Sequence, residues 1–189
     1  MHAEIVITGS GGQGVLLISR LLAEAALLEG REVVWLPTYG AEKRGGTVSC
    51  NVTISDEKIG ALFISRPSAA IVMNQASLEK LEPAMKPDSL LVVNQSLTTS
   101  KVSRKDIRVV YVPANDVAAE LGDDSVANLV TLGALVAGFP VVSTSNIMAA
   151  MGDMFSKNQK HLKINKRAFN KGYTLPPAVG AAGFKTATT

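Results

Sequence analysis

The stretch EIVITGSGGQGVLLISRLLAEAALL, residues 4–28, decides the fold. Its first part, residues 4–8, is a β-branched run of the kind that forms a buried strand. Its last part, residues 12–28, has helical composition, with leucines at helical spacing. The glycine-rich residues 9–14 join these two parts. The chain therefore opens with a strand, a glycine turn and a helix.

Similar patterns continue along the chain. They predict strands at 32–36, 47–55, 69–73, 90–93 and 107–112, and helices at 75–81, 115–121, 125–137, 145–155 and 159–173. We expect the strand at 32–36 to be buried and to end before Pro37. The alternation in 47–55 indicates one wet face, and hence an antiparallel or edge strand. The continuously apolar strands that follow are typical of a parallel sheet buried on both faces.

The alternation of strands and helices predicts a three-layer α/β fold with a mostly parallel sheet. We expect a single Rossmann-like, doubly wound domain over residues 1–174, followed by a loosely ordered tail at 175–189. The length of 189 residues fits one such domain but not two.

Composition and charge exclude several classes of protein. With 47% hydrophobic residues the chain can bury a core, which excludes disordered and collagen-like proteins. A net charge of +3 is too small to indicate nucleic acid or an anionic membrane as a partner. No apolar stretch reaches the roughly 20 residues that span a bilayer. Residues 1–4, MHAE, lack the basic start of a signal peptide, so we expect a cytoplasmic protein.

The glycine turn fits the pattern G-x-G-x-x-G, in the position that this pattern requires. Free backbone N–H groups at the start of a helix stabilise a phosphate, a pyrophosphate or a carboxylate. The alternative is that the glycines only make a tight turn. An NAD site expects an acid at the end of the second strand, and the first acid after that strand is Glu42. A P-loop expects Lys and Ser or Thr after the last glycine, but Val15 and Leu16 follow it.

A second glycine-rich stretch, YGAEKRGG at 39–46, follows the second predicted strand. Loops at the carboxyl ends of strands gather at the crevice of an open sheet, so we expect this stretch to approach the glycine turn. Arg44, next to Gly45 and Gly46, offers a guanidinium fork and accessible amides to an anion or to a partner's carboxylate. A solvated basic turn is the alternative.

Catalytic side chains are scarce. His2 and His161 have no neighbours at the spacing of a metal site or a catalytic triad, and Cys50 on an apolar face is expected to be a packed thiol. One cysteine cannot hold an iron–sulfur cluster or a structural zinc ion. Residues 156–171 carry six basic side chains and no acid. They indicate a docking face for an acidic partner, an approach path for a polyphosphate, or, as we favour, a solvated helix packed through Leu162 and Phe169.

Taken together, several motifs resemble the gamma subunit of 2-oxoacid:ferredoxin (or acceptor) oxidoreductases. The motifs are GSGGQG at 9–14, YGAEKRGGT at 39–47, SCNV at 49–52, ANLVTLG at 127–133 and NKRAFNKGY at 165–173. The likeness covers most of the chain up to the tail. The Tyr-Gly-x-Glu form of the second motif is more similar to the subunits of 2-oxoglutarate and branched-chain 2-oxoacid enzymes than to the indolepyruvate group.

The resemblance implies a cytoplasmic complex that converts a 2-oxoacid, preferably 2-oxoglutarate, and coenzyme A to an acyl-CoA and CO2, with ferredoxin as electron acceptor. It implies partner alpha and beta subunits, and a delta subunit in some complexes, that hold thiamine diphosphate, Mg and [4Fe-4S] clusters. This chain then has no catalytic or metal-binding residue and holds no cofactor tightly. Coenzyme A is a substrate that this chain helps to bind. Its expected ligands are Gly9, Ser10, Gly11, Gly12, Gln13, Gly14, Arg44, Gly45 and Gly46.

Two residues have more than one possible role. Tyr39, Glu42, Lys43 and Asn128 are expected at subunit contacts, but Asn128 could instead cap or staple a helix. Gln13 could bond either the ligand or a partner. Two other functions remain open at this level, a free-standing nucleotide-dependent oxidoreductase of Rossmann type and a pure scaffold that binds no small molecule.

Overall fold

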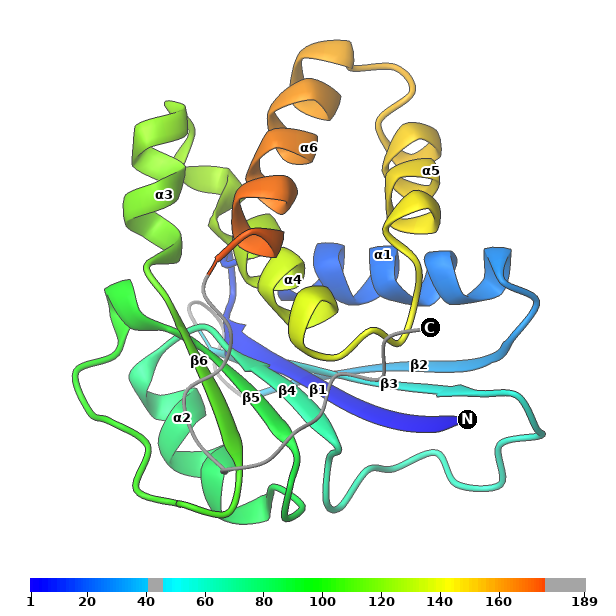
Figure 1. Ribbon diagram of the computed structural model, residues 1–189, viewed down its shortest axis with the longest axis vertical. Coiled ribbons are helices and arrows are strands. Elements are labelled where there is room, and N and C mark those ends of the chain that lie inside the picture. Colours follow the sequence, from blue (N-terminus) through cyan, green and yellow to red (C-terminus); the bar gives the residue numbers. More distant parts are fainter. Residues whose placement is uncertain (41–45, 176–189) are drawn as a thin grey trace.

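The structure, a computed structural model, describes residues 1–40 and 46–175 (Figure 1). Six strands form one sheet in the order β2-β3-β1-β4-β5-β6. The strands are β1 (His2–Ser10), β2 (Glu32–Tyr39), β3 (Thr47–Ser55), β4 (Ala69–Val72), β5 (Leu90–Asn94) and β6 (Arg108–Val112). The helices are α1 (Val15–Leu28), α2 (Gln75–Leu81), α3 (Ala114–Leu121), α4 (Ala127–Gly138), α5 (Thr144–Met154) and α6 (Gln159–Tyr173). Each corresponds to an element that the sequence predicts.

The sheet is mostly parallel, as predicted. Strands β1, β4, β5 and β6 run side by side in one direction. Strand β3 pairs antiparallel with both β1 and β2. Of the two alternatives predicted for Thr47–Ser55, the antiparallel strand is confirmed, whereas β3 lies inside the sheet and not at its edge. The predicted wet face is wrong, because the residues of β3 are all buried or half-buried between β1 and β2.

The predictions for the second strand are wrong in two respects. Strand β2 is the edge of the sheet, with half-buried and exposed residues, and it continues through Pro37 to Tyr39. The Gly40 N–H donates to the Thr47 carbonyl at 2.7 Å, and since bonded pairs alternate along an antiparallel ladder, the backbone of Pro37 faces outward. A proline is tolerated there because no ladder hydrogen bond is lost.

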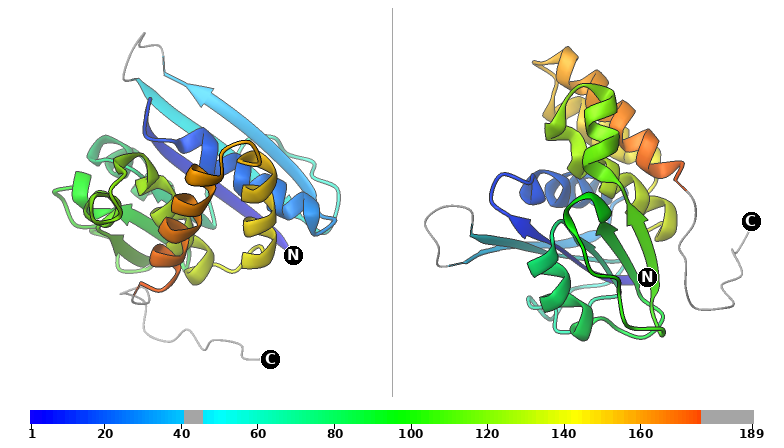
Figure 2. Two further views of the ribbon diagram at one scale, coloured as in Figure 1. Left: turned by 90° about the horizontal axis from the view of Figure 1, so that it is seen from above. Right: turned by 90° about the vertical axis from the view of Figure 1, so that its left-hand side faces the viewer.

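Helices cover both faces of the sheet, as a doubly wound fold requires. Helices α1 and α3–α6 lie on one face and α2 lies on the other (Figures 1 and 2). The large core lies between the sheet and the first group, where ten residues of α4 are buried. A smaller core joins β4, β5 and β6 to α2 through Val72, Leu78, Leu91 and Val93. The three-layer prediction is therefore confirmed.

Helices α4 and α6 cross at two glycines. A Cβ atom at Gly133 would lie 2.1 Å from the Phe169 carbonyl oxygen, and one at Gly172 would lie 1.9 Å from the Val130 carbonyl oxygen. Both glycines belong to motifs that carried the family resemblance. Their place in the fold gives them a packing role, because only glycine lets the two backbones approach so closely.

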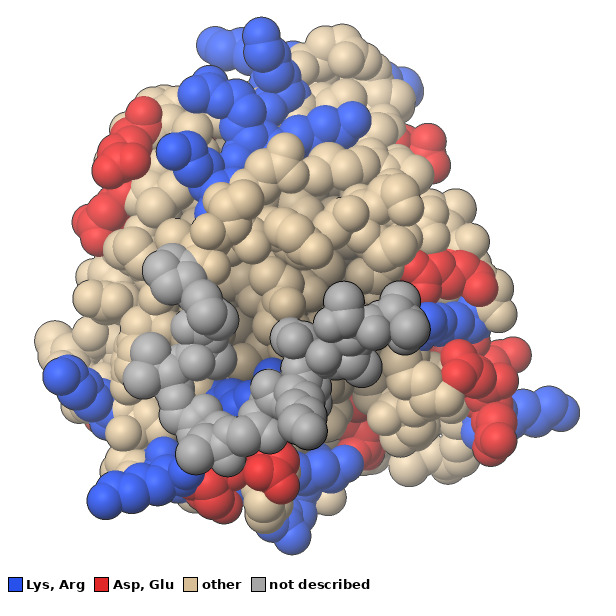
Figure 3. Space-filling model, viewed as in Figure 1, with Lys and Arg blue, Asp and Glu red and all other residues tan. Residues whose placement is uncertain are grey.

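The basic side chains of residues 156–171 project from the outer side of α6 (Figure 3). The opposite side of the helix packs through Phe169, which is fully buried, and through Leu162, which is partly buried. The packing that the sequence suggested for this helix is thus confirmed. Among residues 1–40 and 46–175, no helix combines the length and apolarity needed to cross a bilayer.

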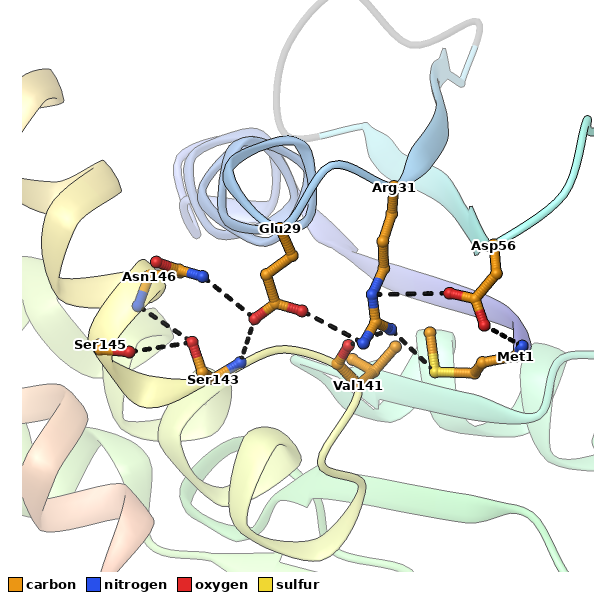
Figure 4. Close-up of polar contacts among 8 residues, drawn as sticks. All are labelled: Met1, Glu29, Arg31, Asp56, Val141, Ser143, Ser145 and Asn146. Atoms are coloured by element: carbon orange, nitrogen blue, oxygen red, sulfur yellow. Dashed lines mark hydrogen bonds and ion pairs between the residues drawn. The ribbon is translucent and has the colours of Figure 1, made fainter.

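A polar network lies at the amino ends of the parallel strands (Figure 4). The guanidinium of Arg31 lies 3.2 Å from the carboxylate of Glu29 and 3.8 Å from that of Asp56, and it donates to the Val141 carbonyl at 2.9 Å. The Ser143 N–H donates to Glu29 at 2.6 Å. The network thereby joins the end of α1 and the start of β2 to the turn before α5.

Candidate functional site

The glycine turn lies at the carboxyl end of β1, between β1 and the start of α1. Gly12 and Gly14 have φ angles of 92° and 72°, in the left-handed region that favours glycine. Gly9 is required for a different reason, since a Cβ there would lie 2.8 Å from the Cβ of Met73. The sequence pattern therefore reflects torsional requirements at Gly12 and Gly14 and a close approach at Gly9.

The second glycine-rich stretch reaches this turn. The Gly11 N–H donates to the Gly46 carbonyl oxygen at 3.0 Å, so residues 35 positions apart are joined at the same end of the sheet. The predicted proximity of the two stretches is confirmed at Gly46. Tyr39, at the end of β2, is 65% exposed. Four further predicted residues, Glu42, Lys43, Arg44 and Gly45, lie outside the described residues.

The side chain of Gln13 folds back onto the chain. Its Oε1 accepts hydrogen bonds from the Ser10 N–H at 2.7 Å and from the Asn74 amide at 3.0 Å, and its Nε2 donates to the Met73 carbonyl at 3.3 Å. The sequence left open whether Gln13 bonds a ligand or a partner. In the part of the chain that the structure describes, its amide holds the turn against the end of β4.

Asn74 is a functional candidate that the sequence analysis missed. Its Nδ2 donates to Ser10 Oγ at 2.9 Å as well as to Gln13, while its Oδ1 accepts the Ser77 N–H at 2.9 Å and caps α2. One side chain thus connects the glycine turn to the next parallel strand and helix. A signal existed in the sequence, because a polar residue directly after a buried parallel strand lies at the crevice of the sheet.

Asn128 holds the turn from the opposite side. It is 2% exposed, its Nδ2 donates to the Gly14 carbonyl at 3.2 Å, and its Oδ1 accepts the Leu129 N–H at 2.9 Å. A Cβ at Gly14 would lie 1.9 Å from this Nδ2. Of the two roles that the sequence left open for Asn128, these contacts favour the structural one.

Several backbone donors of the turn have no acceptor within residues 1–40 and 46–175. The N–H groups of Ser10, Gly11 and Gln13 are used in the bonds described above or in a turn. Among residues 1–40 and 46–175, five of these N–H groups have no acceptor, and they belong to Gly12, Gly14, Val15, Leu16 and Leu17. The first turn of α1 carries no acidic residue. The helix dipole and these donors therefore favour an anion at this position.

Polar side chains continue along the same edge beyond β4. Asn94, at the end of β5, is fully buried, and its Nδ2 donates to Asn115 at 2.8 Å and to the Met73 carbonyl at 3.3 Å. Its Oδ1 has no hydrogen-bond partner within residues 1–40 and 46–175. The carboxyl ends of β1, β4 and β5 thus share one amide-rich edge, at the point where the connections switch from one face of the sheet to the other.

The remaining chemical candidates lie elsewhere. Cys50 is fully buried, and burial raises the pKa of its thiol above its ordinary value, although hydrogen bonds with Ser19 and Leu36 oppose the rise. His2 and His161 are exposed. Among the described residues, no group of three His, Cys, Asp or Glu side chains is placed to hold a metal ion. The described chemistry at the crevice is that of backbone N–H groups and neutral amides.

Comparison with known proteins gives consistent matches. The family model described as pyruvate ferredoxin/flavodoxin oxidoreductase matches residues 4–175. The 2-oxoglutarate synthase subunit KorC of Methanocaldococcus jannaschii is 33% identical over 178 residues, which cover 93% of this chain and 94% of KorC. The ketoisovalerate oxidoreductase subunit VorA of Methanothermobacter thermautotrophicus is 34% identical over 172 residues. That match covers 90% of this chain but only 36% of VorA, so the chain spans about a third of that relative.

Solved structures share the fold. The gamma subunit of a keto/oxoacid ferredoxin oxidoreductase from Geobacter sulfurreducens matches with a TM-score of 0.77 and 30% identity, over 90% of this chain and 96% of that one. A 2-oxoglutarate:ferredoxin oxidoreductase from Magnetococcus marinus, with 2-oxoglutarate, coenzyme A and succinyl-CoA bound, matches with a TM-score of 0.82 and 24% identity. This second match covers 91% of this chain and 30% of that one.

Proposed function

The chain belongs to the pyruvate ferredoxin/flavodoxin oxidoreductase family, and from this premise we propose that it is the gamma subunit of a 2-oxoacid:ferredoxin oxidoreductase. In this function the complex converts a 2-oxoacid and coenzyme A to an acyl-CoA and CO2, and ferredoxin takes up the electrons. Relatives named as 2-oxoglutarate synthase subunits favour 2-oxoglutarate as the substrate. Thiamine diphosphate, Mg and the iron–sulfur clusters belong to the partner subunits.

The role of this chain is to help bind coenzyme A at the mouth of the active site. The observation that carries this role is the meeting of the two glycine-rich stretches at Gly11 and Gly46, beside N–H groups at the start of α1 that have no acceptor among residues 1–40 and 46–175. The pyrophosphate of coenzyme A supplies the anion that such a site favours. Its ribose has no vicinal diol, so it does not require an acid at the end of β2, where Tyr39 and Gly40 stand.

The binding role is tested by isothermal titration calorimetry with the assembled complex and with this chain alone. Coenzyme A is expected to bind, and NADH is not. Arg44→Ala should weaken coenzyme A binding about tenfold, as the loss of a charge-assisted phosphate contact does. Arg20→Ala is the control for the loss of a positive charge. Arg20 lies on α1, the helix that follows the glycine turn, and its guanidinium pairs with the carboxylate of Glu24 at 2.7 Å.

Two outcomes would count against this function. Tight NADH binding with hydride transfer would favour the free-standing Rossmann-type oxidoreductase, which the missing acid and the family match disfavour. Equal affinity for coenzyme A in the wild type and in Arg44→Ala, with full activity of the complex, would leave this chain as a scaffold. Co-expression with its neighbouring subunits, followed by size analysis and a thiamine assay, tests the assembly itself.

A further inference from the structure

A row of positive side chains follows one side of α6. Lys160, Lys163, Arg167 and Lys171 are spaced three or four residues apart, so they lie on the same side of the helix. All four are exposed, and Figure 3 shows basic side chains gathered over α6. Lys171 lies eleven residues after Lys160, which is about 16 Å along the helix axis. We call these four residues the basic row.

The basic row is unfavourable for the chain on its own. Like charges three or four residues apart on a helix repel each other, and α6 contains no acidic residue. Within residues 1–40 and 46–175, none of the four forms an ion pair. Lys160 also lies in the first turn, where the helix dipole disfavours a cation. An anionic partner would relieve this repulsion, and such a departure from helix preferences is expected at a functional surface.

Acidic side chains border the basic row. Helix α3 packs against α6 and carries Asp116 and Glu120, both exposed. Figure 3 shows acidic side chains over α3 next to the basic ones over α6. Residues 156–171 hold six positive charges, more than the net charge of +3, so the rest of the chain is net negative.

This arrangement of charge limits the kind of partner. A nucleic acid or an anionic membrane presents negative charge over a wide area, and α3 would repel it beside the row. A folded protein can instead present a few carboxylates to α6 and keep other carboxylates away from α3. The row therefore fits a protein with a compact acidic face.

The chemistry of the row is that of a transient contact. The centre of a permanent interface is apolar or aromatic and poor in lysine, whereas all four members of the row are charged. Among the described residues of α6, the one exposed large apolar side chain is Tyr173, at the end of the helix. Complementary charges speed the encounter of two proteins and give binding that salt weakens. The row is therefore suited to a partner that binds and leaves, and not to a resident subunit.

In the proposed function, the protein that binds and leaves during turnover is the electron acceptor, ferredoxin. We propose that the basic row of α6 is a docking surface for this acceptor, which binds through an acidic face. This proposal rests on the proposed function. The row supplies attraction and α3 limits the orientation by repulsion, while the electrons come from the iron–sulfur clusters of the partner subunits.

The test uses the assembled complex with Lys160→Glu and Arg167→Glu combined in this chain. At low ionic strength we expect the KM for ferredoxin to rise about tenfold or more, because two attractive charges become repulsive. The rate with methyl viologen, a small dye that accepts electrons without protein docking, should not change. The variant alternates opposite charges along α6, so its melting temperature should not fall below that of the wild type.

Lys101→Glu combined with Lys105→Glu is the matched control. Both lysines are exposed, and the net charge changes by the same amount. They lie on the connection from β5 to β6, which Gln75 and Glu82 hold against the other face of the sheet through the N–H groups of residues 99 and 103. We expect this pair to leave the KM for ferredoxin within about twofold of the wild type, because the pair lies away from the row.

The outcomes separate this proposal from the proposed function. An unchanged KM for ferredoxin in the α6 variant overturns the docking surface and leaves the gamma-subunit function intact. An equal rise in the control assigns the effect to net charge and also overturns it. An equal loss of the methyl viologen rate, or dissociation of the complex in size analysis, makes the row a subunit contact and overturns it as well. A wild-type complex that oxidises no 2-oxoacid with either acceptor overturns the proposed function itself.

Discussion

Three amide side chains, Gln13, Asn74 and Asn128, surround the glycine turn and direct their hydrogen bonds to it. Gln13 bonds the Ser10 N–H, Asn74 bonds Ser10 Oγ and Gln13, and Asn128 bonds the Gly14 carbonyl. A turn held from both sides keeps its backbone N–H groups in a fixed orientation before a ligand binds. Preorganised donors bind an anion with less loss of conformational entropy.

The contact between Gly14 and Asn128 predicts a non-additive pair of substitutions. Gly14→Ala places a Cβ at φ 72° and 1.9 Å from Asn128 Nδ2, so we expect it to lower the free energy of unfolding by about 2 kcal/mol or more. In an Asn128→Ala background the steric part is relieved, and the same change should cost about 1 kcal/mol less. Urea unfolding of the four proteins measures this coupling.

Gly12→Ala is the control for this cycle. Gly12 has φ 92°, but a Cβ there would meet nothing within 4 Å, so only the torsional penalty applies. We expect its effect on stability to be the same with and without Asn128→Ala. If Asn128→Ala changed the effects of Gly12→Ala and Gly14→Ala equally, a steric clash between Asn128 and a Cβ at Gly14 would be contradicted.

The two functions of Asn74 can be separated by one substitution. Asn74→Asp keeps the oxygen that caps α2 but removes the Nδ2 donor to Ser10 and Gln13. We expect the cap of α2 to persist while the Ser10 and Gly11 amides exchange hydrogen at least tenfold faster, measured by native-state hydrogen exchange. Asn74→Ala should lose both the cap of α2 and the contacts with the glycine turn, and we expect it to lower the free energy of unfolding by about 1 kcal/mol more. Unchanged exchange in both variants would contradict the role of Asn74 in the turn.

At the scale of elements, α4 is the helix on which the site and the core both depend. Its first turn carries Asn128, which holds the glycine turn, and its middle carries Gly133, which receives α6. Ten of its residues are buried. A change in the packing of α6 against Gly133 therefore affects α4, and α4 also carries Asn128, which bonds the glycine turn.

Alanine at the crossing of α4 and α6 should be strongly destabilising. Gly133→Ala sets a Cβ 2.1 Å from the Phe169 carbonyl oxygen, which is backbone and cannot turn away, so we expect a loss of about 3 kcal/mol. Gly152→Ala on α5 is the matched control, since its Cβ meets nothing within 4 Å and helix propensity then stabilises by about 0.5–1 kcal/mol. Thermal and urea unfolding compare them. Equal effects would contradict the close approach of α4 and α6.

At the scale of the whole molecule, the two ends of the parallel strands differ in chemistry. The carboxyl ends bear the glycine turn with its backbone N–H groups and neutral amides, whereas the amino ends bear the network around Arg31 and Glu29 (Figure 4). Charges are paired at one end, and at the other end backbone donors have no acceptor in the part of the chain that the structure describes. This division is expected of an open α/β sheet, in which ligands bind beyond the carboxyl ends.

The network predicts acid sensitivity. Burial raises the pKa of Glu29, but hydrogen bonds from Ser143 and Asn146 and the charge of Arg31 outweigh burial, so the pKa lies below its ordinary value. A lowered pKa gives stability that is present above the unfolded-state pKa and is lost as the pH falls through the folded-state pKa. Glu29→Gln should therefore be less stable than the wild type at pH 7, by about 1 kcal/mol, with the difference shrinking below about pH 4. Urea unfolding across this range measures it, and a difference independent of pH would contradict the account.

The sequence by itself determined the order of strands and helices, the antiparallel strand at Thr47–Ser55 and the place of the glycine turn. These follow from local properties, namely the period of apolar residues and the torsional freedom of glycine. The sequence also pointed to the second glycine-rich stretch, and the family resemblance added the expectation of a gamma subunit. It could not separate the motif residues that form the turn from those that support it.

Only the tertiary structure decided that β2 is the edge strand and that Asn74 and Asn128 hold the turn. It also showed which residues join the two glycine-rich stretches, namely Gly11 and Gly46. Asn74 and Gln13 are 61 residues apart in sequence, and Asn128 and Gly14 are 114 apart. Such contacts depend on strand order and helix crossing, which no local pattern specifies. Contacts between residues far apart in the sequence therefore determine where each motif residue lies. Some lie in the glycine turn, some beside it, and some at the crossing of α4 and α6.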